Sequence, residues 1–222
     1  MEKNRLDAVV FDIDGTLTYT NELIFKSINH VYRVHRGKEL TPAEVIAMFG
    51  PTEEELFEKE FGGEADKVAV DYFSYYSDNH HIAGLYPGLT EILKHLKRRG
   101  VFLGVFTGKG RRSATITLDK TGVLGYFDLL IAGDDVENKK PSGEGLKKIL
   151  EKSGAAPERT LMIGDAPGDI KASRDAGVKV ASVLWDSYAK EKVEALGSDH
   201  YVYSVDELKE LIYEYTGGAE TN

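Results

Sequence analysis

The chain has 222 residues, 41% of them hydrophobic and 29% charged, which is typical of one large globular domain or of a core domain with a smaller insert. It contains no cysteine, so disulfides, thiolate chemistry and cysteine-ligated zinc are excluded, and a reducing cytoplasm is the expected compartment. The formal net charge of -9 argues against nucleic acid as a partner, and the apolar runs are too short to span a membrane.

Five short segments rich in Val, Ile, Leu and Phe are predicted to be buried strands of a parallel sheet. They are Leu6–Phe11, Val101–Phe106, Asp128–Ile131, Thr160–Ile163 and Lys179–Val183. Helical patterns lie between the later strands, at Leu89–Arg99, Arg111–Thr121, Gly143–Ser153 and Asp169–Asp175. This alternation predicts a doubly wound α/β fold, in which the functional site lies at the carboxyl ends of the strands.

The stretch after the first strand breaks the alternation. From Thr18 to Ala83 there is no convincing strand. Four helical patterns occur instead, at Asn21–His35, Pro42–Phe49, Glu53–Phe61 and Glu64–Asn79. We therefore predict a core domain of residues 1–17 and 84–222 and a small, all-helical cap domain of residues 18–83. The last residues, Thr216–Asn222, are expected to form a frayed tail.

The first predicted strand ends in the sequence DIDGT, residues 12–16. A D-x-D-G-T sequence arises by chance at any one position with a probability on the order of 10⁻⁵. In a regular strand Asp12 and Asp14 point to opposite faces, so a turn at Gly15 is needed to bring Asp14 back to the site. The alternative interpretation is that both acids only cap a turn.

Two further strand ends carry groups that suit phosphate. Thr107 follows the second strand, and Gly108 and Lys109 lead into the next helix. A hydroxyl beside backbone N–H groups at a helix start is a typical site for a phosphate oxygen. Lys140, fixed before Pro141, could neutralise phosphate as a point charge, although Lys139 leaves an ambiguity of one residue. Each of these observations is weak alone.

The fourth strand ends in two more carboxylates, Asp165 and Asp169. Converging carboxylates repel one another and are tolerated when a cation lies among them. Oxygen ligands favour Mg²⁺, which binds one or two carboxylates together with waters and substrate phosphate. None of these segments contains His or Cys, so zinc is not expected.

Together, these four segments resemble the signature motifs of the haloacid dehalogenase superfamily. Their order and spacing are similar to its phosphatase branch, which carries a helical cap after the first motif. Within that branch, the segments Tyr86–Gly88 and Gly133–Val136 are similar to phosphoglycolate phosphatase-like and β-phosphoglucomutase-like members. The resemblance covers essentially the whole chain and implies a Rossmann-like core.

The resemblance also implies catalytic roles. Asp12 would be the nucleophile that forms an aspartyl-phosphate. Asp14 would act as general acid and then as general base. Thr107 and Lys140 would hold the phosphoryl oxygens.

The remaining implied roles concern metal and substrate. Asp165 would ligate Mg²⁺ with Asp169 in support, and Asp14 would add its backbone carbonyl. The predicted metal set is Asp12, Asp14, Asp165 and Asp169, and the predicted substrate-binding set is Gly15, Thr16, Gly108 and Lys109. The cap segment Phe49–Glu54 could supply a specificity loop over the phosphate site, although a simple turn between helices is an equal alternative.

Two positions depart from the family pattern. Tyr19 stands where relatives often carry Asp, which places cap closure or substrate preference in question. Ala166 follows Asp165 where Ser is usual, so a hydroxyl near the metal is lost.

The implied function is Mg²⁺-dependent hydrolysis of a small-metabolite phosphate monoester, with phosphoglycolate as the best single candidate. A sugar-phosphate mutase, a pyrophosphatase and a nucleotidase are the alternatives, and a phosphonate hydrolase would need a Schiff-base Lys in the cap. A dehalogenase is disfavoured because Asp14 is present. A non-catalytic phosphate-sensing module is the remote alternative, and the expected assembly is a monomer or a homodimer.

Overall fold

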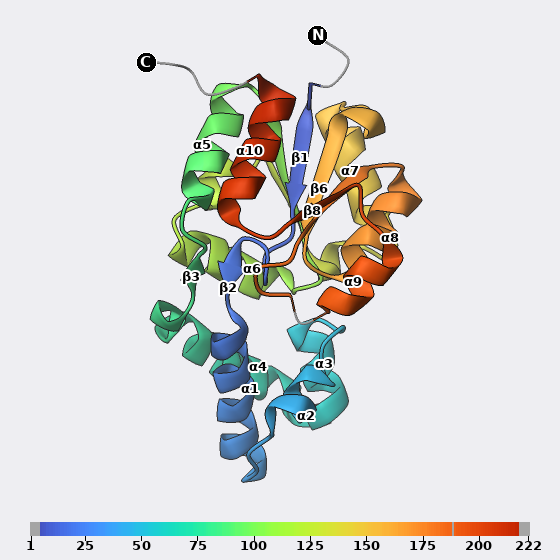
Figure 1. Ribbon diagram of the computed structural model, residues 1–222. Helices are drawn as coiled ribbons and strands as arrows, with labels where there is room; N and C mark the ends of the chain where they lie inside the picture. Colours follow the sequence, from blue (N-terminus) through green and yellow to red (C-terminus); the bar gives the residue numbers. More distant parts are fainter. Residues whose placement is uncertain (1–4, 188, 218–222) are drawn as a thin grey trace.

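The computed structural model describes residues 5–187 and 189–217, which form a larger part built on a sheet and a smaller helical part (Figure 1). The sheet has six parallel strands in the order β5-β4-β1-β6-β7-β8. These strands are β1 (Ala8–Phe11), β4 (Phe102–Phe106), β5 (Leu129–Ile131), β6 (Thr160–Gly164), β7 (Lys179–Val183) and β8 (His200–Val202). The predicted α/β class and all five predicted strands are confirmed.

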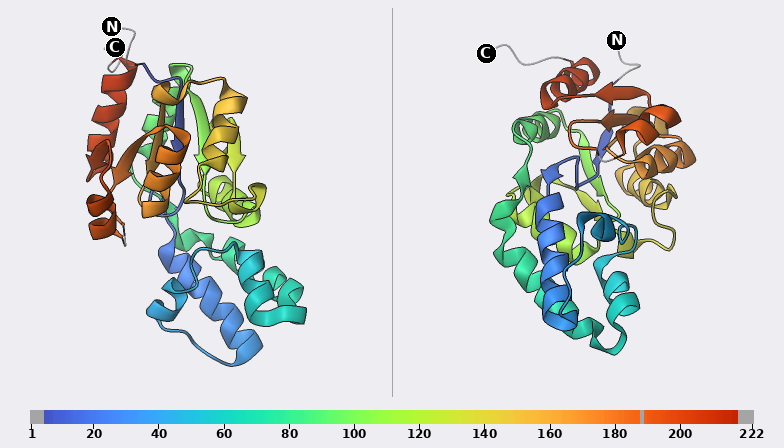
Figure 2. Two further views of the ribbon diagram at one scale, coloured as in Figure 1. Left: turned by 90° about the vertical axis from the view of Figure 1, so that its right-hand side faces the viewer. Right: turned by 60° about the horizontal axis from the view of Figure 1, so that its bottom comes forward.

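Strand β1 lies inside the sheet between β4 and β6, and all four of its residues are buried. Its last residue, Phe11, is in register with Val105 of β4 and with Ile163 of β6. The three strands therefore end at one edge, and the motif residues that follow them emerge together. This shared edge faces the smaller helical part of the protein (Figures 1 and 2).

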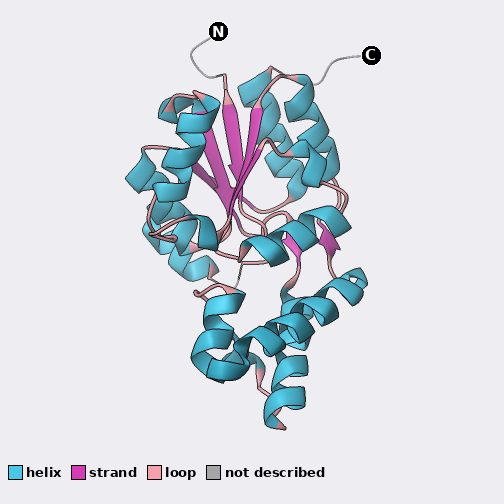
Figure 3. Ribbon diagram, turned by 180° about the vertical axis from the view of Figure 1, so that it is seen from behind, coloured by secondary structure: helices cyan, strands magenta, loops and turns pink. Residues whose placement is uncertain are grey.

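Helices cover both faces of the sheet, as Figure 3 shows from behind. One face packs against α5 (Leu89–Arg98), α6 (Arg111–Lys120) and α10 (Val205–Thr216), and the other against α7 (Glu144–Ser153), α8 (Pro167–Ala176) and α9 (Lys190–Leu196). The alternation along β1 explains the division, because Val9 and Phe11 belong to the first apolar cluster and Val10 to the second. Within the described ranges, no helix is long and apolar enough to cross a membrane.

The smaller part is helical and has an apolar core of its own. It contains α1 (Asn21–Arg36), α2 (Pro42–Ile46), α3 (Glu53–Phe61) and α4 (Ala65–Asp78), followed by a short 3₁₀ turn at His80–Ile82. We call these four helices the cap. The aromatic residues Tyr72, Phe73 and Tyr76 of α4 are buried in the cap core, where the Tyr72 ring contacts those of Phe57, Phe73 and Tyr76. Burial of these large rings holds the cap helices together.

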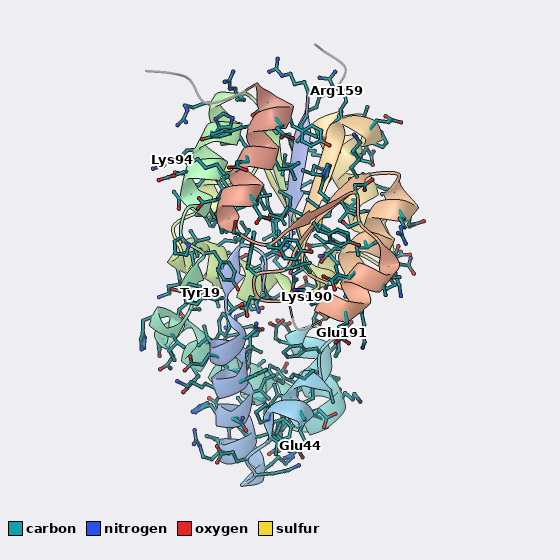
Figure 4. All side chains as sticks on the ribbon, in the orientation of Figure 1. Tyr19, Glu44, Lys94, Arg159, Lys190 and Glu191 are labelled. Atoms are coloured by element: carbon teal, nitrogen blue, oxygen red, sulfur yellow. The ribbon has the colours of Figure 1, made fainter. Side chains whose placement is uncertain are left out.

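Two antiparallel segments link the cap to the sheet. They are β2 (Thr18–Tyr19) and β3 (Gly84–Leu85), so the chain enters and leaves the cap side by side. Tyr19 lies at this junction (Figure 4), with its ring edge-on to Tyr86 at 5.7 Å between centroids. The Tyr86 hydroxyl in turn donates a hydrogen bond of 2.5 Å to Asp186. Tyr19, which stands where relatives often carry Asp, thus makes an aromatic contact at the base of the cap.

The prediction that no strand occurs between Thr18 and Ala83 is wrong at β2, and strand β8 was not predicted. Two residues are too few to show a strand period, and β8 has only three residues at the edge of the sheet. The helices α9 and α10 were not predicted either. Thr216 belongs to α10, and the rest of the predicted tail lies, apart from residue 217, outside the described residues.

We expect Gly145→Ala to destabilise the fold, although alanine usually stabilises a helix relative to glycine. A Cβ at Gly145 would lie 2.2 Å from Phe106 Cε2, so α7 would have to move away from the sheet. The expected loss is about 1–3 kcal/mol in the free energy of unfolding, measured by denaturant titration. Gly125→Ala is the control, because a Cβ there meets no atom within 4 Å. An equal effect of both substitutions would contradict this packing argument.

Candidate active site

Three carboxylates meet at the edge of the sheet that faces the cap. Asp12 follows β1, Asp165 follows β6, and Asp169 lies in the first turn of α8. Each can present an oxygen within 4.8 Å of the others. The structure therefore brings together three of the four residues predicted to form the metal site.

Asp12 is the central member of this group. Its backbone N–H donates to the Ile163 carbonyl at 2.9 Å, which continues the pairing of β1 with β6. Its Oδ1 atom is buried and accepts no hydrogen bond from the described residues, although Lys140 Nζ lies 3.1 Å away. Burial raises the pKa of Asp12 to about 6; the charges of Asp169 and Asp14 add to this rise, and the charge of Lys140 opposes it.

Two glycines leave space for the other acids. At Gly15, where φ is +76°, a Cβ would lie 2.6 Å from Asp165 Oδ2. At Gly164 a Cβ would lie 2.3 Å from the Asp169 carboxyl carbon. Asp169 is further fixed by the Ala166 backbone N–H, which donates to its Oδ2 at 3.0 Å. A side chain at either glycine would displace a carboxylate.

The donor set fits a Mg²⁺ ion. All donors are oxygen atoms, one of them, Asp12 Oδ1, is buried and has no hydrogen-bond donor among the described residues, and the acids repel one another. Burial, followed by the charges of Asp12 and Asp169, raises the pKa of Asp165 well above its ordinary value. A divalent cation at this position would remove that penalty.

Lys140 is the cation that the structure places beside the acids. Its Nζ lies 2.5 Å from Asp169 Oδ1 and 3.1 Å from Asp12 Oδ1. Although burial lowers the pKa of Lys140, the two carboxylates raise it more, and the pKa lies above its ordinary value. The neighbouring Lys139 points elsewhere and pairs with Glu55 of the cap.

Asp14 is held apart from the acidic cluster. Its carboxylate accepts a hydrogen bond from the Thr20 hydroxyl and lies 3.1 Å from Lys109 Nζ. The Lys109 side chain is only 3% exposed. Thr107 is buried at the end of β4, and its hydroxyl accepts a hydrogen bond from the Lys109 N–H at 3.3 Å.

A cavity of about 290 Å³ lies between this edge of the sheet and the cap. Its core lining includes the predicted residues Asp12, Asp14, Thr107, Gly108, Lys109, Lys140 and Asp169. The cap supplies Asn21, Ile24, Ile28, Met48, Phe49, Gly50, Pro51, Glu53, Leu56 and Tyr72. The segment Phe49–Glu54, predicted as a possible specificity loop, thus contributes four residues to the wall.

Other predicted substrate-binding residues lie elsewhere. Gly15 and Thr16 do not line this cavity, and Thr16 is 1% exposed. Gly15 shapes the position of Asp165 instead, because only a residue without a side chain fits there. Four apolar cap residues of the cavity, Ile24, Ile28, Met48 and Leu56, were not predicted, since Ile, Leu and Met give the same signal whether they face a core or a ligand.

The chain is similar to known proteins over most of its length. Residues 9–183 match the family described as haloacid dehalogenase-like hydrolase. Pyrophosphatase PpaX of Bacillus cereus (strain B4264) is 32% identical over 209 residues, which cover 94% of this chain and 95% of that protein. Pyrophosphatase PpaX of Bacillus mycoides (strain KBAB4) is 31% identical over the same length, with 94% and 96% covered.

Solved structures share this fold over nearly the whole chain. A Lactobacillus plantarum protein assigned as a phosphoglycolate phosphatase has a TM-score of 0.75 at 25% identity, covering 93% of this chain and 99% of that one. A Thermotoga maritima protein assigned as a β-phosphoglucomutase has a TM-score of 0.72 at 26% identity, covering 93% and 98%. With the family match spanning most of the sequence, this chain belongs to the haloacid dehalogenase-like hydrolase family.

Proposed function

We propose that this protein is a Mg²⁺-dependent phosphatase that hydrolyses a small phosphate monoester through an aspartyl-phosphate on Asp12. The observation that carries the proposal is the position of Asp12 in the cavity, beside two further acids and a buried lysine. A carboxylate that attacks an anionic phosphate needs positive charge around the transferred group. Lys140 supplies one such charge.

The residues around Asp12 have separate parts in this proposal. Asp165 and Asp169, with Asp12, would hold Mg²⁺, which would neutralise the phosphoryl oxygens when bound. Lys140 and the Thr107 hydroxyl would bind the same oxygens. Thr107 follows β4, Asp165 follows β6, and Asp169 lies in the first turn of α8. These groups therefore meet at one edge of the sheet.

Asp14 is suited to move a proton to the leaving group. It lines the cavity, yet its oxygens are held by Thr20 and Lys109 rather than by the acidic cluster. It would give its proton to the departing ester oxygen and then take one from the water that attacks the aspartyl-phosphate. The two acids of the DIDGT motif therefore take different roles because their surroundings differ.

Phosphoglycolate remains the substrate that the family resemblance suggests. Pyrophosphate is the second candidate, because the relatives compared above are named pyrophosphatases. Both molecules are small enough for a cavity of about 290 Å³. Each also carries negative charge on its leaving group. The charged residues around Asp14, the proposed proton donor to that leaving group, should therefore affect which of the two substrates is hydrolysed faster.

The proposed mechanism predicts that phosphate release depends on Asp12 and on Mg²⁺. Release is measured with phosphoglycolate, pyrophosphate, sugar phosphates, nucleotides and an aryl phosphate. We expect Asp12→Asn to lower kcat/KM by at least about a thousandfold, and EDTA to abolish turnover. Asp119→Asn, on the exposed side of α6, is the control and should retain activity. Full activity of Asp12→Asn would contradict the covalent mechanism.

Mg²⁺ should stabilise the protein more at pH 7.5 than at pH 5. The pKa of Asp12 rises from 3.8 to about 6 on folding without metal, so proton binding favours the folded state. That contribution is fully present below pH 3.8 and is lost as the pH rises through about 6. Asp165 shifts in the same direction. Mg²⁺ replaces the protons, and the ligands must be deprotonated to bind it.

The measurement is the melting temperature with and without Mg²⁺ at the two pH values. We expect an increase of several degrees at pH 7.5 and a much smaller one at pH 5. In Asp12→Asn the increase at pH 7.5 should shrink. A Mg²⁺ effect that is equal at both pH values would contradict the assignment of these acids as ligands.

A further inference from the structure

The charge of Lys109 is compensated by two carboxylates from different parts of the protein. Asp14 Oδ2, from the core, lies 3.1 Å from Lys109 Nζ, and Glu53 Oε1, from the cap, lies 3.6 Å from it. The ammonium group also lies 5.2 Å from the centre of the Tyr76 ring. All three charged side chains line the cavity that contains Asp12.

Glu53 is held in place by the start of α6 as well as by Lys109. Its Oε2 accepts a hydrogen bond of 2.9 Å from the Gly110 backbone N–H. Its Oε1 accepts one of 2.5 Å from the Ser113 hydroxyl. The carboxylate is thus bound as an external anion would be, by a buried lysine, a backbone N–H and a hydroxyl.

Asp14 connects the proposed reaction to Lys109 and Glu53. If Asp14 protonates the departing ester oxygen, as proposed above, the rest of the leaving group lies in the part of the cavity that Asp14, Lys109 and Glu53 line, where Lys109 contacts both carboxylates. Among the described residues that line the cavity, only Lys109 and Lys140 carry positive charge. Lys140 contacts Asp12 and is proposed to bind the phosphoryl oxygens, whereas Lys109 contacts Asp14, so Lys109 is the cation on the side of the leaving group.

We propose that Glu53 occupies the position that a second negative charge on the substrate would take, and is therefore a specificity-determining residue. An anionic leaving group reaches Lys109 only by displacing Glu53, whereas an uncharged one leaves the Lys109–Glu53 pair intact. This inference rests on the proposed phosphatase function, and it concerns only the part of the substrate beyond the ester oxygen.

The test compares two esters that differ in one charge, phosphoglycolate and 2-hydroxyethyl phosphate. The measured quantity is the ratio of kcat/KM for phosphoglycolate to kcat/KM for 2-hydroxyethyl phosphate. Glu53→Gln keeps an oxygen for the Gly110 N–H and removes the charge, so we expect the ratio to rise about tenfold. Glu53→Ala should change the ratio in the same direction. A loss of cap packing alone would affect both esters alike.

Glu58→Gln is the matched control, because Glu58 lies in the same helix on an exposed position. Its ratio should equal that of the unmodified protein. A ratio that is unchanged or lower in Glu53→Gln, while both esters are still hydrolysed, would overturn the role of Glu53 and leave the phosphatase proposal standing. Absence of Mg²⁺-dependent hydrolysis of both esters by the unmodified protein would contradict the proposed function and, with it, this inference.

Discussion

The repulsion among three buried or half-buried carboxylates is the constraint on which the rest of the site depends. Asp12, Asp165 and Asp169 lie close enough to share one cation, and burial makes their charges costly. Much of the surrounding structure keeps them there. Strand β1 is paired on both sides, Gly15 leaves room for one carboxylate, and the Ala166 N–H fixes another. Such an arrangement lowers stability in the absence of a cation and is therefore typical of a functional site.

The two parts of the protein contribute different chemistry to the cavity. The sheet edge supplies the acids and two lysines, of which Lys140 lies beside Asp12 and Lys109 beside Asp14. The cap supplies mainly apolar side chains and one carboxylate, Glu53. Contacts between the start of α3 and the core, including the pairs Glu53–Lys109 and Glu55–Lys139, hold the cap over the site. Under the proposed function, we expect changes in the cap to alter selectivity more than they alter the reacting groups.

The sequence predicts the core and its chemistry better than the cap. Buried parallel strands give continuous apolar runs, and their ends carry rare residue combinations such as DIDGT, so both the sheet and the acidic edge could be predicted. Short elements such as β2 and β8 give no periodic signal, because two or three residues do not define a period. The segment Phe49–Glu54 could be predicted as a possible loop over the site, but the contact of Glu53 with Lys109 could not. Three consecutive glutamates begin α3, and only the packing of α3 on α6 shows which one enters the cavity.

Asp14 and Glu53 both contact Lys109, so the proposed proton transfer and the proposed choice of substrate involve the same cation. Lys109 lies within 3.6 Å of both carboxylates and is almost completely buried. Under the mechanism proposed above, a leaving group that drew Glu53 away from Lys109 would also change the electrostatic field around Asp14, the residue proposed to protonate that leaving group. The charge of the leaving group would then act on proton transfer as well as on binding. Under these two proposals, substrate selectivity and proton transfer depend on the same buried lysine, because Lys109 contacts both carboxylates.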